Sequence, residues 1–181
     1  MQNEAILEAG NTLPPLPSAE RLQELLFDAA RIGRVDVLPA LVSAGADIEA
    51  RDGKGYTPLI LASYNGHEAA TELLIDLGAP VDQPDEVRGN TPLMGTAFKG
   101  FGSIAARLLD GGADPNAVNK AGQTALMMAS LFGHCRMVEL LLSSGADTRI
   151  VDAAGNDAIS VAREQNNHAM VRRLTEANEA R

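Results

Sequence analysis

The chain has 181 residues, a formal net charge of −9 at pH 7, and a hydrophobic content of 45% with only 3% aromatic residues. The acidic balance argues against general nucleic-acid affinity, because phosphate binding relies on an excess of Lys and Arg. No apolar run approaches the roughly 18–20 residues that a membrane-spanning helix needs, so we expect no insertion into a membrane.

The cysteine content and the N-terminal sequence bear on the compartment. The single cysteine, Cys135, excludes an internal disulfide and a cysteine-based zinc site, and it is compatible with a reducing cytoplasm. The N-terminus lacks a basic region followed by an apolar stretch, so the sequence predicts no signal peptide. We therefore expect a cytoplasmic protein, although a leader that had been trimmed would leave no trace in this sequence.

Residues 1–17 are interpreted as a separate lead-in. The run Leu13-Pro14-Pro15-Leu16-Pro17 favours an extended polyproline conformation and cannot continue a helix. A docking peptide for a proline-binding groove is the alternative interpretation of this run. From Ser18 onward, a single domain is predicted to extend to Ala177.

The first helical pair is predicted within residues 18–51. Ser18 is a suitable N-cap for a helix over residues 20–30, and Gly33 supplies the left-handed turn that follows. A second helix is predicted over Val35–Val42. The pair lacks the Thr-Pro opening of the later repeats and carries charged residues on its first helix. We interpret it as an N-terminal capping repeat, whose outer side must be polar.

A motif then returns at nearly constant spacing through residues 52–84, 85–118 and 119–151. Each copy contains Gly-x-Thr, a glycine in its middle, and Leu-Leu followed by Gly-Ala near its end. Threonine can cap a helix, and proline, where present after it, suits the first helical turn, so each copy is predicted to begin a helix there. A fixed period of about 20–50 residues indicates a solenoid of stacked supersecondary units.

The last copy, residues 152–177, departs from the motif. Asp157-Ala158-Ile159 stands where Thr-Pro-Leu is expected, and Asn166 takes the place of the glycine in the middle. Asparagine is the next best residue at a positive φ. We interpret this copy as a C-terminal cap and expect residues 178–181 to fray.

The copy over residues 85–118 is one residue longer than its neighbours. The extra residue falls in residues 85–88, before Gly89, at the tip of a predicted hairpin. It is either a neutral surface insertion or a longer finger that reaches a partner.

The repeated motif resembles that of the ankyrin repeat family. The Gly-x-Thr-Pro-Leu opening, the Gly-His in the middle and the Leu-Leu-x-x-Gly-Ala-Asp ending match over about residues 18–177. The resemblance implies an all-α repeat solenoid, elongated and curved, in which each repeat is a hairpin finger followed by helix-turn-helix. It also implies a non-catalytic role in binding other proteins. The family's histidine after Thr-Pro-Leu is absent here, and we expect apolar packing in its place, since the position holds, in chain order, Ile60, Met94, Met127 and Ser160.

Three residues that could suggest chemistry have structural interpretations. His67 and His134 both follow the glycine in the middle of a repeat, and we expect their imidazoles to bond backbone groups of the adjoining turn. Cys135 directly follows His134, and neighbouring helical side chains diverge, which disfavours a nucleophilic Cys–His pair. The sequence contains no phosphate-binding glycine loop and no Ser-His-Asp pattern. We therefore predict a protein that is not an enzyme and that has no metal site and no cofactor.

In the ankyrin pattern, the binding side is a concave groove lined by finger tips and by the ends of the inner helices. Tyr64, Phe98 and Phe132 fall just before the mid-repeat turn of three consecutive repeats, so stacking of the repeats should align their rings. The alternative is that these rings fold back as packing. The candidate protein-binding residues at groove positions are Tyr56, Tyr64, Asn65, Arg88, Asn90, Phe98, Lys99, Gln123, Leu131 and Phe132.

Basic residues also concentrate at groove and finger positions of this acidic chain: Arg31, Arg51, Lys54, Arg88, Lys99, Lys120 and Arg163. Such a groove suits a protein surface or peptide with apolar anchors and some carboxylates. The resemblance leaves open an accessory role for a bacterial oxidative-stress enzyme such as catalase. A structural spacer, whose groove rings would be dispensable, is a further alternative. We expect a monomer, because both ends are interpreted as caps.

Overall fold

The computed structural model describes residues 17–179, and the lead-in predicted over residues 1–17 lies almost entirely outside them. Helices and connecting loops make up the described part of the chain, without a β-strand. The helices are α1 (Ala19–Ile32), α2 (Leu38–Ser43), α3 (Pro58–Tyr64), α4 (Glu68–Asp76), α5 (Pro92–Lys99), α6 (Gly102–Asp110), α7 (Ala125–Leu131), α8 (Cys135–Ser143), α9 (Ala158–Glu164) and α10 (His168–Glu179).

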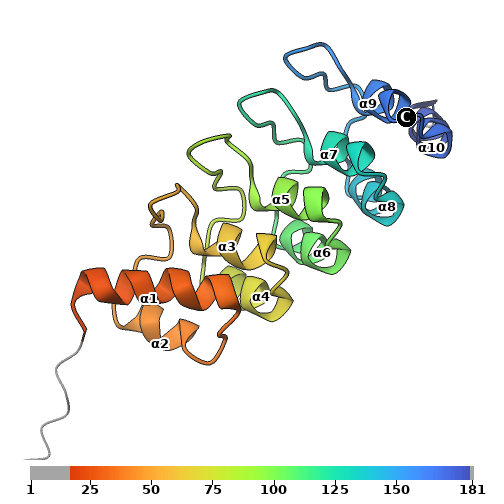
Figure 1. The fold of residues 1–181 in the computed structure, drawn as a ribbon. Coiled ribbons are helices and arrows are strands. Elements are labelled where there is room, and N and C mark those ends of the chain that lie inside the picture. The colour runs from red at the N-terminus through yellow and green to blue at the C-terminus, as the bar shows by residue number, and fades with distance from the viewer. Residues whose placement is uncertain (1–16, 180–181) are drawn as a thin grey trace, which may run out of the picture.

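The helices stack as antiparallel pairs along one direction, and the long loops project as fingers from one side of the stack (Figure 1). The inner helices α1, α3, α5, α7 and α9 form one row, in which consecutive members contact each other. Outer helices α2, α4, α6 and α8 form a second row, and α10 packs on α9. The result is the elongated, all-helical repeat solenoid that the periodicity predicts.

Each full repeat begins its inner helix in the same way. The hydroxyls of Thr57, Thr91 and Thr124 accept from the backbone N–H three residues further on, at 3.2, 3.4 and 3.2 Å. In the last repeat Asp157 takes this role and forms a capping box with Ser160. These caps satisfy N–H groups that a helix leaves without an internal partner.

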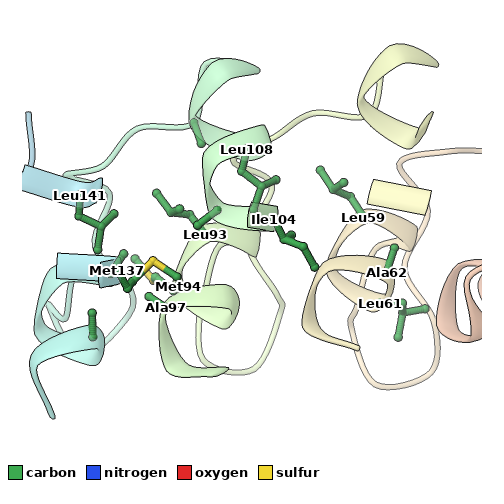
Figure 2. Close-up of a cluster of buried hydrophobic side chains, with 14 of the residues drawn as sticks. Leu59, Leu61, Ala62, Leu93, Met94, Ala97, Ile104, Leu108, Met137 and Leu141 are labelled. Atoms are coloured by element: carbon green, nitrogen blue, oxygen red, sulfur yellow. The ribbon is translucent and has the colours of Figure 1, made fainter. Parts of the chain in front are cut away.

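The core is a continuous ribbon of aliphatic side chains between the two rows of helices. Leu59, Leu93, Ile104 and Leu108 lie in this ribbon, each at most 2% exposed (Figure 2). Met94 is also fully buried, which agrees with the apolar packing expected where the family places a histidine. The last repeat differs, because Ser160 there serves the capping box instead of filling the core.

A side chain of each repeat packs over the turn glycine of the repeat before it. The Nε2 atom of His67 lies 2.9 Å from the Arg31 carbonyl oxygen, and that of His134 lies 3.2 Å from the Phe98 carbonyl oxygen. The bonds to backbone are therefore as expected, but the acceptors belong to the preceding repeat and not to the adjoining turn. A Cβ added at Gly100 would lie 2.9 Å from the His134 ring, so this contact requires the glycine.

Two helix bounds differ from the prediction. The second helix begins at Leu38 and not at Val35, because Pro39 lacks an N–H and its ring would clash with an additional preceding turn.

In the loop before α2, the hydrogen bond from the Arg34 guanidinium holds the pKa of the Asp36 carboxyl below its usual range.

At the other end of the chain, α10 continues through Glu179, two residues beyond the helix end predicted at Ala177. The side chain of Asn178 accepts a hydrogen bond of 3.0 Å from the buried Thr148 hydroxyl. This contact with the preceding repeat holds the end of the helix.

Candidate protein-binding groove

The fingers are held by one kind of turn. Asp52, Asp85, Asn119 and Asp152 each accept two or more backbone N–H groups of their own finger through side-chain oxygens. Neighbouring fingers are joined by backbone bonds of 2.9–3.2 Å, such as the one from Lys120 N–H to the Arg88 carbonyl. The fingers therefore form a preorganised wall beside the inner helices.

Two hollows lie between the fingers and the inner helices, with volumes of about 590 and 250 Å³. The larger is bounded by α3, the start of α5 and the two fingers before them. The smaller lies one repeat further along, between α5 and α7. The predicted site residues that line one or both hollows are Tyr56, Tyr64, Asn65, Arg88, Asn90, Phe98, Gln123, Leu131 and Phe132.

Three rings from successive repeats form what we call the aromatic strip: Tyr64, Phe98 and Phe132. The ring centroids of Tyr64 and Phe98 lie 6.3 Å apart and nearly parallel, and those of Phe98 and Phe132 lie 4.6 Å apart in an edge-to-face arrangement. The three side chains remain 41%, 40% and 47% exposed, so they contact one another without entering the core. Leu131 adds a further exposed apolar side chain beside them.

Gly95 explains how the first ring of the strip finds its place. A Cβ at this residue would lie 3.3 Å from the Tyr64 ring, so the missing side chain makes room for the ring against α5. Lys99, the predicted site residue that lines neither hollow, places its Nζ 4.7 Å from the centroid of the same ring. This is the geometry of a cation–π contact.

Several of the predicted groove cations are engaged within the protein. Arg31 pairs with Asp28 and Asp52 at 2.7 and 3.1 Å. The guanidinium of Arg51 and the ammonium of Lys120 donate to backbone carbonyls of neighbouring fingers, those of Pro84 and Glu86 respectively. These three cations therefore stabilise the wall of fingers instead of facing a ligand.

Arg88 and Lys54 differ from these engaged cations. Both line the larger hollow, Arg88 lines the smaller one as well, and their side chains have no hydrogen-bond or ion-pair partner among residues 17–179. The charge that the groove leaves available is therefore positive, on a chain whose net charge is −9.

Asn119 is a groove residue that the sequence reasoning did not select. It is 8% exposed and lines the smaller hollow. Its amide nitrogen donates to the side-chain oxygens of Asn90 and Gln123, at 2.8 and 3.1 Å. The available signal was the replacement of an aspartate, since the corresponding turn residues of the other fingers are Asp52, Asp85 and Asp152.

Within the described residues, histidine, cysteine and carboxylate side chains do not form a group of three or more that could hold a metal ion. Across residues 17–179, no helix combines the length and the apolar character that crossing a membrane requires.

Comparison with known proteins supports the resemblance to the ankyrin repeat family. A family model of ankyrin repeats in three copies matches residues 26–117 and 93–181. An ankyrin repeat-containing protein of Treponema pallidum (strain Nichols) is 36% identical over 91 residues, which is 50% of this chain and 30% of the relative.

Two mammalian proteins show the same likeness over part of their length. Ankyrin repeat and SAM domain-containing protein 6 of Mus musculus is 30% identical over 109 residues, 60% of this chain and 12% of the relative. Ankyrin repeat and SOCS box protein 3 of Bos taurus is 38% identical over 92 residues, 50% of this chain and 18% of the relative. The chain thus spans less than a third of each of these relatives. Ankyrin repeats are generally non-catalytic modules for protein–protein interaction, and this chain belongs to the ankyrin repeat family.

Proposed function

We propose that the protein is a non-catalytic interaction module that binds a partner protein in the groove between its fingers and inner helices. The aromatic strip is the observation that supports this proposal most directly. Exposed aromatic patches mark interaction sites, and aromatic side chains dominate the energetics of interfaces. Three mutually contacting rings, each at least 40% exposed, provide such a patch beside the two hollows.

The experiment is affinity capture from an extract of the source organism, comparing the wild-type chain with the Tyr64→Ala/Phe98→Ala/Phe132→Ala variant. We expect the wild type to retain a protein that the variant loses, because the variant lacks the apolar anchors of the groove. Circular dichroism and thermal unfolding establish that the variant is folded. A Val118→Ala/Val151→Ala variant is the matched control, since it removes exposed apolar side chains that line neither hollow.

The captured protein also separates the remaining interpretations. Equal capture by the wild type and the triple variant would contradict the groove proposal. A spacer function would then remain, since it does not need the rings. Identification of an oxidative-stress enzyme, lost with the rings, would assign the accessory role to this groove.

A further inference from the structure

The orientation of three amide side chains in the groove is fixed by backbone groups. The Oδ1 of Asn119 accepts from the backbone N–H of Ala121 and of Gln123, both at 2.9 Å. Its other amide atom must therefore be the nitrogen, which can only donate. Asn90 and Gln123 consequently turn their side-chain oxygens toward Asn119, at 2.8 and 3.1 Å.

The consequence is a surface that offers donors. With their oxygens toward Asn119, Asn90 and Gln123 keep amino groups that have no acceptor among the described residues. Both line the smaller hollow together with the unpartnered guanidinium of Arg88. We call Arg88, Asn90 and Gln123 the donor corner. A group that bonds to it must supply acceptors, and an anion would do so most strongly.

The acidic side chains closest in sequence to Arg88 do not satisfy it. Asp85 accepts from the backbone N–H groups of Val87, Arg88 and Asn90. Glu86 faces Arg51, with 3.6 Å between the charged atoms. No carboxylate lines the smaller hollow, so Arg88 is the one charged group there within the described residues.

The same hollow has an apolar side. Phe98, Leu131, Phe132 and Met128 line it beside the donor corner. A ligand group that fills the hollow therefore combines an acceptor with apolar surface. One free guanidinium matches a single negative charge, as on a carboxylate, better than the nearly double charge of a phosphate.

We propose that the donor corner binds the side-chain carboxylate of an Asp or Glu within an extended segment of the partner, next to an apolar residue that packs on Phe98 and Phe132. An internal residue is favoured over a chain end because Arg88 and Asn90 line both hollows, so the segment continues to either side. This inference rests on the proposed function, because it concerns the partner of the same groove.

The test begins with a display library of random peptides held between fixed linkers and selected on the full-length chain. Peptides that also bind the Phe98→Ala/Phe132→Ala variant are discarded. We expect the remaining sequences to share an Asp or Glu beside an aromatic or aliphatic residue. One of them is then synthesised with both ends blocked, and its Kd is measured by calorimetry.

Two substitutions locate the carboxylate. Arg88→Gln, and separately Asp→Asn or Glu→Gln in the peptide, should each raise Kd by about tenfold, the usual scale for a hydrogen bond to a charged group. Together they should raise it little further, because both remove one interaction. The matched control is Arg136→Gln, which removes the same charge from an exposed arginine of α8 that lies outside the groove and has no partner among residues 17–179.

Asn119→Asp tests the donor corner through the residue that orients its amides. The aspartate can accept the same two backbone N–H groups, as Asp52 and Asp152 do in their fingers, so the turn should persist. Its second oxygen would reverse the amides of Asn90 and Gln123, which would then present oxygens to the hollow. We expect this variant to bind the acidic peptide at least tenfold more weakly and to lose its preference over the amide peptide.

Failure of this inference is distinct from failure of the groove proposal. Selected peptides that lack an acidic residue, or a Kd unchanged by Arg88→Gln, would overturn the carboxylate site while leaving ring-dependent binding intact. Selected peptides that are all insensitive to loss of the rings would overturn the groove itself.

Three further arms test the occupant. The first arm is a second library whose peptides end in a free C-terminus. If binding depends more strongly on that terminal carboxylate than on an Asp or Glu side chain, the occupant of the donor corner is a chain end. A phosphoserine peptide that binds more tightly than the acidic one would replace it by phosphate. Arg88-dependent binding of a synthetic peptide of residues 1–16, which contains Glu4 and Glu8, would assign the groove to the chain's own N-terminal segment instead of a partner.

Discussion

At the scale of single residues, the proposed function assigns stability and recognition to different side chains of the short helix α5. Leu93 is fully buried between the rows of helices, whereas Phe98 is 40% exposed on the groove side. A buried leucine loses transfer free energy and leaves a cavity when it is truncated. An exposed ring loses only contacts that water partly replaces.

We therefore expect Leu93→Ala to lower the free energy of unfolding by about 2–5 kcal/mol. Phe98→Ala removes the contacts with the neighbouring rings. Apart from that loss, it should change the free energy of unfolding by about 0.5 kcal/mol or less. Urea unfolding followed by circular dichroism measures both. Equal destabilisation by the two variants would show that Phe98 is a core residue and that the aromatic strip is packing.

Glycine at a turn is the second residue-scale determinant. Gly100 and Gly112 both have positive φ, 76° and 93°, but only Gly100 has a neighbour, the His134 ring, where a Cβ would be added. Gly112→Ala should therefore cost about 1–2 kcal/mol for the left-handed backbone, and Gly100→Ala should cost more.

A second substitution, His134→Ala, tests whether the histidine ring causes the additional loss of stability at Gly100. Combining Gly100→Ala with His134→Ala removes the ring that the new methyl group would meet. Thermal unfolding of the single and double variants should then give a cost for Gly100→Ala close to that of Gly112→Ala. A cost that is the same with and without the ring would remove the steric explanation.

Residue identities predicted the placement of the rings but not the organisation of the polar side chains. The spacing of Tyr64, Phe98 and Phe132 relative to the turns was enough, because stacked repeats bring equivalent positions together. The part played by Asn119 depends on which atoms its amide meets in the neighbouring finger. Repeat spacing places that finger but does not orient an amide.

At the scale of helices, the caps determine where each inner helix begins. Asp157 accepts the Ser160 N–H at 2.7 Å, and Ser160 returns a contact of 2.8 Å to the Asp157 N–H. Asp157→Ala removes half of this capping box and should destabilise the last repeat by about 1 kcal/mol. Hydrogen exchange of α9 and α10 measures it, and Asp157→Asn, an equally good cap, should retain protection.

Helix ends were the part of the fold that the sequence predicted least well. Pro39 moved the start of α2, and the bond between Asn178 and Thr148 extended α10. The first effect is local and could have been included in the prediction. The second joins two repeats and needs their relative position. The assignment of residues 18–51 and 152–177 as capping repeats stays a prediction.

At the scale of the whole molecule, the stack has no central core, because each repeat contacts mainly its neighbours (Figure 1). A globular domain of 181 residues has a radius of gyration of about 16 Å. We expect small-angle X-ray scattering to give a larger value for this chain. A value at or below 16 Å would contradict the extended arrangement of the repeats.

The architecture could be predicted from the sequence because it is periodic and its contacts are local in sequence. The partner could not, since the motif defines only the frame of the groove, and under the proposed function exposed residues such as Arg88 and Phe98 determine what it binds. Such exposed residues can be exchanged without changing the core.

The contact between each turn glycine and a side chain of the next repeat has a consequence for how such chains change in length. Gly33 accommodates His67, Gly66 accommodates Phe101, and Gly100 accommodates His134. If residues 85–118 were deleted, Gly66 would meet His134, a pairing of the kind already present at Gly33. Gain or loss of a repeat during evolution therefore requires no new kind of junction at this turn. Under the proposed function, it would lengthen or shorten the partner segment that the groove accommodates.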